Sequence, residues 1–288
     1  LPLDKIGAFA EFVVINQDAI AKVPDYLTDE EAAAVPLTAL TIMQALELMG
    51  AESGKTIFIS GGTGGVGGMA IPIAKAKGLK VITNGSVENK ERVEKLGVDQ
   101  FIDYKTTDYT KVLKDVDYVL DTLGGAETEK QMTIMKSGGK LVSLRAMPNG
   151  SFAKRMNLAW WKQFILGLAG RKFDKMANKY GVSYNFIFVQ SNGKQLQEVA
   201  DIFKKLEIKP SVDTVFDFED VNKALDKVID FLPNVIVALG GGSSLDTAKS
   251  IKYFVKKSDL SIPLIALPTT SGTGSEVTSY AVLTDKKN

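Results

Sequence analysis

The sequence predicts an α/β protein built around a doubly wound parallel sheet. From Ile57 to Leu144, short apolar runs alternate with stretches of helical periodicity, as in chains of alternating strands and helices. The runs are apolar throughout, which is expected of strands covered on both faces. A glycine-rich turn separates the first run from the first helical stretch. Right-handed crossovers in such a sheet place the ligand at the carboxyl ends of the strands.

The elements follow from these patterns in chain order. Residues 7–23 read as two short strands around the turn Asn16-Gln17-Asp18. Thr28 caps a helix, with Glu31 completing a capping box, and a second helix runs from about Thr38 to Met49. Strands are then predicted at Ile57–Ser60, Lys80–Thr83, Phe101–Asp103, Tyr118–Asp121, Lys140–Leu144, Tyr184–Val189 and Asp213–Phe216, and helices at Met69–Lys77, Glu88–Leu96, Glu127–Met135, Lys194–Leu206 and Phe218–Val228.

The glycine-rich turn carries the first chemical signal. Gly62, Gly64 and Gly67 fit the spacing G-x-G-x-x-G between a strand and a helix, the fingerprint of a Rossmann dinucleotide site. The first glycine allows a tight turn, the second lets a pyrophosphate approach the backbone, and the third lets helix and strand pack closely. The helix N-terminus offers free N–H groups to the anion. A plain strand–helix connection is the alternative.

The end of the second strand indicates which dinucleotide would bind. NAD sites usually place Asp or Glu there to bind the ribose hydroxyls, but this chain has Thr83-Asn84-Gly85-Ser86, followed by Asn89, Lys90 and Arg92. A neutral hydroxyl-bearing loop with nearby cations favours the 2′-phosphate of NADP. The alternative is that Lys90 and Arg92 are ordinary solvated helix residues.

Two further residues follow predicted strands. Asp121 could act as a base, but a strand-end carboxylate that caps the next helix is the favoured reading. Tyr104 follows the third strand and lies either beside the adenosine or at a half-buried edge.

Residues 151–182 interrupt the alternation of strands and helices. Leu158, Trp161, Phe164, Ile165 and Leu168 recur at helical spacing. A packed amphipathic helix is the favoured interpretation. A substrate lid or a subunit contact is the next, and an interfacial membrane helix is the least favoured.

A second unit that resembles a nucleotide site begins near residue 229. A strand at 234–239, a turn at Gly240-Gly241-Gly242-Ser243 and a helix at 245–257 lead to a strand at 262–267. The glycine turn has the context for phosphate binding, and Asp246 in the first helical turn is either a ligand contact or a dipole partner. Thr269 and Thr270 begin the hydroxyl-rich loop that follows.

Composition excludes several classes of function. The chain has 288 residues, 45% apolar and 24% charged, with a net charge of +1, so nothing suggests nucleic acid or a membrane as partner. It contains no cysteine and no histidine, which excludes disulfides, thiolate nucleophiles and a His-assisted triad and disfavours catalytic zinc. No signal peptide is evident, so a cytoplasmic location is expected.

Residues 5–228 resemble the medium-chain dehydrogenase/reductase superfamily, in its zinc-free quinone and enone oxidoreductase branch. The resemblance rests on Gly7–Phe12, Glu30–Thr41, Gly62–Gly67, Leu96–Asp99 with Phe101–Tyr104, and Gln190–Gly193. It implies a metal-free oxidoreductase that transfers hydride from NADPH to a quinone or an α,β-unsaturated carbonyl. It further implies that Thr41 approaches the nicotinamide side or its phosphate, and that Gly64, Gly65, Val66 and Gly67 hold the pyrophosphate. Ser86 and Lys90 would hold the 2′-phosphate, and Tyr104 would contact the adenosine.

Residues 229–288 resemble the nucleotide domain of iron-dependent alcohol dehydrogenases, through Ala238–Lys249 and Pro268–Glu276. The Asp and His metal ligands of that family have no counterpart here. The two resemblances together predict a remnant of a GroES-like, β-rich substrate domain at 1–40, truncated relative to the family, and an NAD(P)-binding Rossmann domain at 41–180. They predict a return to the substrate domain at 181–228 and a partial second α/β nucleotide unit at 229–288.

Three functional hypotheses follow. The first is an NADPH-dependent quinone or enone reductase, with a homodimer as one open arrangement and catalytic residues unassigned, because no side chain stands out as proton donor. The second is a truncated or fused NADP-binding protein without turnover. An alcohol dehydrogenase is the least favoured, because the metal ligands are missing.

Overall fold

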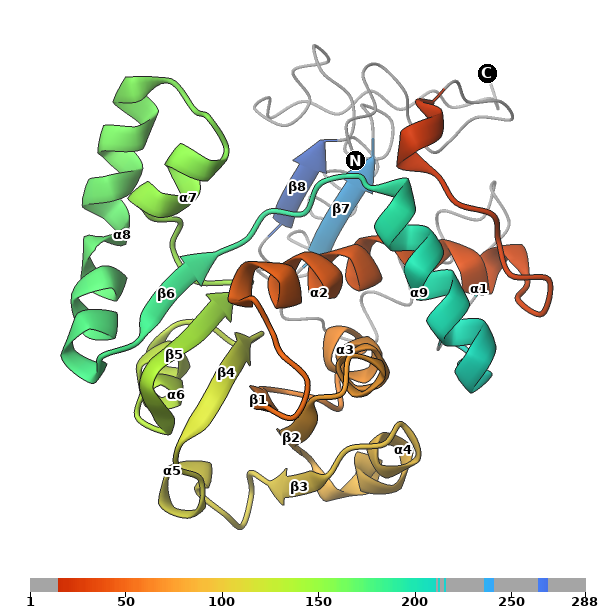
Figure 1. The fold of residues 1–288 in the computed structure, drawn as a ribbon, viewed down its shortest axis with the longest axis horizontal. Coiled ribbons are helices and arrows are strands. Elements are labelled where there is room, and N and C mark those ends of the chain that lie inside the picture. Colours follow the sequence, from red (N-terminus) through yellow and green to blue (C-terminus); the bar gives the residue numbers. More distant parts are fainter. Residues whose placement is uncertain (1–14, 211, 213–214, 216–235, 241–263, 269–288) are drawn as a thin grey trace, which may run out of the picture. The chain divides into compact units, whose positions relative to one another are not determined.

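The computed structural model describes residues 15–210, 212, 215, 236–240 and 264–268. Ala21–Ser211 forms one compact unit, and Val212–Asn288 together with Leu1–Ile20 forms a second. The first unit contains a six-stranded sheet in which every neighbouring pair of strands is parallel (Figure 1). The predicted doubly wound α/β architecture is therefore confirmed. The strands are β1 (Thr56–Ile59), β2 (Lys80–Gly85), β3 (Gln100–Asp103), β4 (Val116–Asp121), β5 (Met135–Ser143) and β6 (Ser183–Phe186).

The strand order is β3-β2-β1-β4-β5-β6, so the order reverses between β1 and β4. Open α/β sheets bind ligands at such a switch point, outside the carboxyl ends of the strands. One continuous row of Cα partners crosses the whole sheet near that edge. From β3 to β6 its members are Phe101, Thr83, Ile59, Leu120, Val142 and Asn185.

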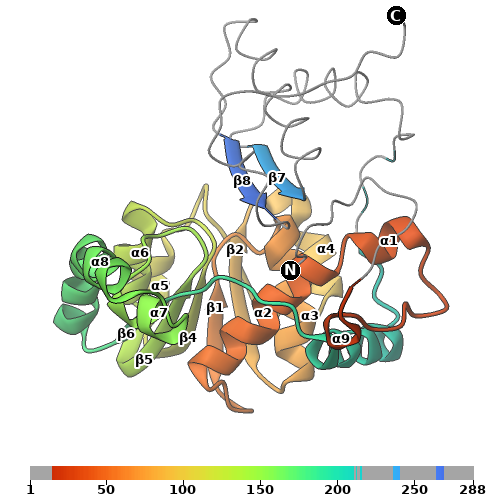
Figure 2. The same cartoon turned by 90° about the horizontal axis from the view of Figure 1, so that it is seen from above.

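The two faces of the sheet are buried by different helices. Ile57 and Ile59 contribute to the apolar cluster formed with α2, α3 and α9, and Figure 2 shows these three helices side by side. Phe58, which points to the opposite face, belongs to the cluster formed with α5, α6 and α8. The helices of this unit are α1 (Asp29–Ala33), α2 (Pro36–Met49), α3 (Gly65–Ala76), α4 (Lys90–Lys95), α5 (Tyr109–Val112), α6 (Ala126–Met132), α7 (Gly150–Arg155), α8 (Trp160–Tyr180) and α9 (Gly193–Leu206).

The residues at the N-termini of α1 and α2 explain where these helices begin. The Thr28 side chain accepts the Glu31 N–H, and the Glu31 carboxylate accepts the Thr28 N–H, so the predicted capping box is present. Pro36 at the first position of α2 needs no helical acceptor. An 18-residue window within Asp29–Met49 has a mean hydropathy of 1.5, enough by length and composition to span a membrane, and 44% of that window is buried. Because α2 supplies much of one core cluster, it is a core helix of this unit.

Gln44 of α2 fixes the segment that leads into α9. Its amide nitrogen donates to the Gln190 carbonyl oxygen at 2.7 Å, and its amide oxygen accepts the Gln190 N–H at 3.0 Å. The Asn192 side chain then caps α9 by accepting the Gln195 N–H at 3.1 Å. The stretch Gln190–Gly193 is thus a docking and capping segment between two helices.

One expectation for the N-terminal region is wrong. The second of the two strands predicted within residues 7–23 is absent from the described part of that range, where Gln17–Ala19 forms a 3-10 helix. Ile20 has extended torsion angles, but residues 20–23 are not assigned to a strand in the described part of the chain. The first of these strands lies outside the described residues.

The favoured interpretation of residues 151–182 is also wrong. They form α7 and the 21-residue α8, but the apolar stripe of α8 faces outward. Phe164 is 65% exposed and Leu168 is 55% exposed. The inner side of α8 packs through the buried small residues Gly170 and Ala177 and through three partly buried side chains, Phe173, Met176 and Tyr180. A Cβ at Gly170 would lie only 2.5 Å from the Asn149 Cα. The sequence predicted the helix correctly, but it did not predict which face of the helix packs against the core.

The second unit contributes two described strands, β7 (Ile236–Gly240) and β8 (Leu264–Pro268), which pair in parallel. Gly240 ends β7 and is the Cα partner of Pro268. The rest of the second glycine turn and the loop after β8 lie outside the described residues, namely Gly241, Gly242, Ser243, Asp246, Thr269 and Thr270. The predicted strand at 213–216, apart from residue 215, and the predicted helix at 218–228 also lie outside them. Their assignments stay predictions.

Asp99 ties the start of β2 to the end of α3. Its carboxylate accepts the Val81 N–H at 2.6 Å and two bonds from the Lys75 ammonium at 2.9 and 2.8 Å. Partial burial acts to raise the pKa of Asp99, but the hydrogen bonds from Lys75 and Val81 and the nearby positive charge outweigh it. The pKa is therefore held below its ordinary value.

We expect Asp99→Asn to lower the free energy of unfolding by about 1 kcal/mol near neutral pH, since the pair is only partly shielded from water. A lowered folded-state pKa stabilises the fold above the unfolded pKa of about 3.9, and this contribution fades as pH falls through the folded value. The difference between variant and wild type should hence shrink between about pH 5 and about pH 3. Urea unfolding followed by circular dichroism measures it, with the exposed Glu91→Gln as control. A pH-independent difference would contradict this account.

Candidate cofactor site

The turn between β1 and α3 is held against the end of β2 by Asn84. The Asn84 side-chain oxygen accepts the Gly61 N–H at 2.8 Å, and its backbone carbonyl accepts the Gly62 N–H at 3.0 Å. Asn84 is only 5% exposed. The Gly64 N–H closes the turn on the Gly61 carbonyl at 3.0 Å, and Gly64 is the N-cap of α3. The glycine turn is therefore a rigid part of the sheet edge.

Two of the fingerprint glycines are required by packing within the chain. A Cβ at Gly62 would lie 2.0 Å from the Thr83 hydroxyl oxygen, and one at Gly67 would lie 2.3 Å from the Gly62 Cα. Thr83 cannot withdraw, because it is fully buried and donates to the Ile59 carbonyl at 2.6 Å. These glycines bring β1, β2 and α3 into contact.

Of the other two glycines of the turn, Gly65 faces open space and Gly64 approaches only the backbone of the turn itself. A Cβ at Gly65 would meet nothing within 4 Å, and one at Gly64 only the Gly61 carbonyl at 3.3 Å. The first N–H groups of α3, from Gly65, Val66 and Gly67, have no carbonyl one turn earlier in the helix. Free donors, a positive helix end and the absence of side chains form a cradle that fits a pyrophosphate.

The sheet register brings further site residues into line with this cradle. Counting three residues past the row of Cα partners along each strand, from β3 to β6, gives six residues just beyond the carboxyl ends of the strands: Tyr104, Ser86, Gly62, Leu123, Arg145 and Phe188. We call these six residues the edge row. Tyr104 and Ser86 thus lie on the β2–β3 side of the glycine turn, where the predicted adenosine and its phosphate would be.

The cations after β2 have different environments. Lys90 pairs with Glu94 one turn along α4 at 3.6 Å, and both side chains are about half exposed. Such a pair is weak in water, so Lys90 is available to a stronger anion. The Arg92 guanidinium donates to the Thr63 carbonyl in the glycine turn. Arg92 is hence a brace for the turn and not merely a solvated helix residue.

Thr41 lies on α2, which packs along α3. Its hydroxyl donates to the Leu37 carbonyl at 2.7 Å, and the side chain is half-buried. The donor of this hydroxyl is therefore occupied within the helix, while its lone pairs can still accept a bond. The contact predicted between Thr41 and the cofactor stays a prediction.

Asp121 has a structural role. It is fully buried, and its two oxygens accept five hydrogen bonds. The donors are the backbone N–H groups of Leu123 and Gly124 and the side chains of Thr128, Gln131 and Ser143. The N-cap of α6 is Gly125, so Asp121 braces the turn before that helix and does not cap it. With every acceptor position used, it is not available as a base.

The β4–β6 half of the edge row was missed by sequence reasoning. Leu123 is 43% exposed and Phe188 is 49% exposed, and between them stands the exposed Arg145. Within the described part of the chain, the Arg145 side chain takes part in no ion pair or hydrogen bond. Only alignment of the strand ends places these residues together, because they are far apart in the sequence and belong to no motif.

Tyr184 of β6 stabilises the loop that follows Arg145 in the edge row. Its hydroxyl donates to the Met147 carbonyl at 2.6 Å, and burial raises the pKa of the phenol well above its ordinary value. The phenol therefore stays protonated and holds the loop that follows Arg145. No described residue emerges as a proton donor to substrate, and the catalytic residues stay unassigned.

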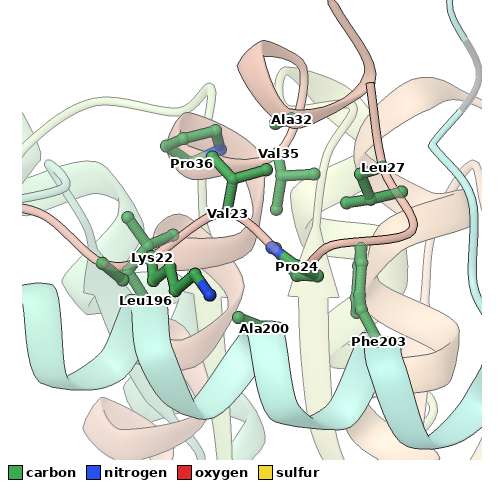
Figure 3. A pocket seen from close by; sticks show the side chains of 11 residues that line it. Lys22, Val23, Pro24, Leu27, Ala32, Val35, Pro36, Leu196, Ala200 and Phe203 are labelled. Carbon is green, nitrogen blue, oxygen red and sulfur yellow. The ribbon is translucent and has the colours of Figure 1, made fainter. Parts of the chain in front are cut away.

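A pocket elsewhere in this unit is apolar (Figure 3). Apolar side chains form most of its wall, and Lys22 is the one charged residue that lines it. The pocket therefore lacks the convergent polar groups of a cofactor or substrate site. It is lined by Ala21, Lys22, Val23, Pro24, Leu27, Ala32, Val35, Pro36, Leu196, Ala200 and Phe203. Among the residues described, no three Asp or Glu side chains cluster as ligands for a metal ion.

This fold and cradle define a dinucleotide-binding domain of the dehydrogenase type. Residues 65–178 match the family model described as zinc-binding dehydrogenase, and residues 167–288 match that of iron-containing alcohol dehydrogenase. The two matches agree with the two resemblances that the sequence predicts, a medium-chain dehydrogenase/reductase domain followed by a part similar to iron-containing alcohol dehydrogenases. The second match begins 62 residues before the expected position 229, inside α8.

Several of the similar proteins are oxidoreductases by name. The chain is 34% identical over 239 residues to the mitochondrial NAD(P)H oxidoreductase RTN4IP1 of Danio rerio, covering 79% of this chain and 61% of that protein. It is 32% identical over 166 residues to 2-methylene-furan-3-one reductase of Solanum lycopersicum, covering 53% and 42%. The chain thus spans about three-fifths of the length of RTN4IP1.

Solved structures agree on the fold. The quinone oxidoreductase from Coxiella burnetii superposes with a TM-score of 0.58 at 24% identity, covering 71% of this chain and 58% of that one. An alcohol dehydrogenase superfamily protein from Novosphingobium aromaticivorans gives a TM-score of 0.58 at 26% identity, covering 73% and 62%.

We expect Gly65→Ala to fold normally and to weaken NADPH binding by about tenfold or more, because the added methyl occupies the open cradle. Fluorescence titration with NADPH measures the affinity. The matched control is Gly68→Ala, one turn along α3, where the Cβ would lie 4.0 Å from Leu96 Cδ1. It should retain the wild-type affinity. Equal affinities for Gly65→Ala and wild type would remove the cradle from the site.

Proposed function

We propose that this protein is a metal-free, NADPH-dependent oxidoreductase that transfers hydride to a quinone or to the β-carbon of an α,β-unsaturated carbonyl. The observation that carries the proposal is the open cradle at Gly64 and Gly65, in line with Ser86 and Tyr104. The names of the relatives, an NAD(P)H oxidoreductase and a reductase of a methylene-furanone, support the reaction class. The lack of any histidine or cysteine supports chemistry without zinc.

Different residues of the chain would bind different parts of the cofactor. The N–H groups of Gly65, Val66 and Gly67 bind the pyrophosphate, Ser86 and Lys90 bind the 2′-phosphate, and Tyr104 covers the adenosine. The nicotinamide, when bound, supplies the hydride. Leu123 and Arg145, just beyond the ends of β4 and β5, would lie on the nicotinamide side of the site.

Arg145 is the group we assign to the acceptor. It is a cation between apolar side chains, so it can donate hydrogen bonds to a carbonyl oxygen that gains negative charge during reduction. Leu123 and Phe188 would supply apolar walls for a planar acceptor. A cytoplasmic location stays a prediction, and the RTN4IP1 relatives are mitochondrial by name.

For the choice of cofactor, we expect NADPH to bind at least tenfold more tightly than NADH, through charge-assisted bonds to the extra phosphate. Lys90→Ala should weaken NADPH by about tenfold and leave NADH unchanged. Lys95→Ala, an exposed lysine on the same helix, is the control. Parallel titrations with both nucleotides measure this, and a preference for NADH would refute the assignment of Ser86 and Lys90.

For turnover, NADPH oxidation is followed at its absorbance maximum with a quinone and with an enone as acceptors. We expect oxidation with at least one of them. Arg145→Met should raise the KM for acceptor or lower kcat by about tenfold, while the dissociation constant for NADPH stays the same. Binding without any oxidation would establish the second hypothesis, an NADP-binding protein without turnover. A loss of NADPH affinity in Arg145→Met would move this residue to the cofactor.

A further inference from the structure

The exposed face of α8 is the largest feature that the reductase site does not use. Trp160, Trp161, Phe164, Ile165 and Leu168 recur at the spacing of one helix face, and they are 81%, 48%, 65%, 53% and 55% exposed. Aromatic residues rarely gather in contact with water without a partner. Figure 1 shows α8 beside α7, at the β6 end of the sheet.

The same face of α8 becomes basic in its second half. Arg171, Lys172 and Lys175 continue the stripe after Leu168, and all three side chains are exposed. Lys162 lies over the Trp161 ring, with its ammonium 5.3 Å from the ring centre. Asp174 is the one acidic residue of the helix, and it turns towards the core, where it accepts a bond from the Asn149 amide at 2.7 Å.

The charge extends beyond the helix. Residues 130–173 contain nine lysines and arginines and no acidic residue, although the whole chain has a net charge of only +1. The nine are Lys130, Lys136, Lys140, Arg145, Lys154, Arg155, Lys162, Arg171 and Lys172. An aromatic face that continues into the basic residues Arg171, Lys172 and Lys175 of the same helix suits a negatively charged surface that also accepts apolar side chains.

We propose that α8 docks the protein onto an anionic lipid bilayer. Trp160, Phe164 and Leu168 enter the region between headgroups and acyl chains, and Arg171, Lys172 and Lys175 bind the acidic headgroups. Sequence reasoning ranked a membrane role lowest for this stripe, and the outward orientation of the stripe is what reverses the order. A second copy of the chain, docked through the same face, would bring two cationic surfaces together, which opposes that alternative. The inference is independent of the proposed reductase activity.

The two tryptophans of the chain, Trp160 and Trp161, both lie on this face. Tryptophan emission therefore reports on α8 alone. We expect the emission of the full chain to shift to the blue when vesicles of phosphatidylcholine mixed with phosphatidylserine are added, and not with phosphatidylcholine alone. Co-sedimentation should follow the same pattern and weaken as salt is raised.

Two variants separate the apolar and the charged contributions. Phe164→Ser with Leu168→Ser, and Arg171→Glu with Lys172→Glu, should each reduce vesicle binding by about tenfold or more. Every substituted side chain is exposed, so the fold should be retained, and circular dichroism checks this. The matched control is Lys204→Glu with Lys205→Glu on α9, where both lysines are also exposed. It should bind vesicles as the wild type does.

Three results would overturn the proposal. One is the absence of any shift or co-sedimentation with the anionic vesicles. Another is an equal loss of binding in the α9 control, which would mean unspecific attraction to charge. The third is a dimer in solution that the Phe164→Ser, Leu168→Ser variant dissociates, since a second copy would then cover the face.

Discussion

The close contact between the glycine turn and the end of β2 is the constraint on which the candidate site depends. Gly62 lies against the buried Thr83 with no room for a methyl group, and Asn84 bonds to the two N–H groups that follow Ser60. This contact sets where α3 begins and which of its N–H groups face outward. Because Thr83 and Asn84 are strand residues, the sheet itself positions the phosphate cradle, and a loop is not needed to form it.

The parallel register extends that constraint across the unit. Strand ends in a parallel sheet meet at one edge, so residues remote in sequence become neighbours there. Tyr104 and Arg145 are 41 positions apart, yet they occupy the same edge row on opposite sides of Gly62. Asp121 stabilises the β4–β5 side by joining the turn after β4, α6 and Ser143 through five hydrogen bonds. A buried carboxylate with all of its acceptor positions filled contributes rigidity to the edge where an acceptor would bind.

The strands and helices of the core were predictable because local signals agreed with the tertiary fold. The apolar run at Ile57–Ile59, the fingerprint glycines and the Thr28 capping box each have a mechanism that acts within a few residues. Boundaries were less secure. Strand β5 begins at Met135, five residues before the predicted start, because Met135 pairs with Val116 of β4 ahead of a register shift, and regular pairing resumes at Lys140. The short helices α5 and α7 were not predicted, because each is too short to show the apolar periodicity of a helix.

The sequence by itself determined the class of fold, the existence of a dinucleotide turn and the kinship with two dehydrogenase families, because spacing and residue type suffice for these. Only the tertiary structure decided the use of individual side chains. It showed that Asp121, a candidate base, has all of its acceptor positions filled, that Arg92 bonds to the glycine turn, and that Arg145 lies exposed just beyond the end of β5. It also turned the aromatic face of α8 outward, since the small residues Gly170 and Ala177 allow that helix to pack closely on its other side. Helical periodicity defines a face, but close packing against neighbours decides which face is buried.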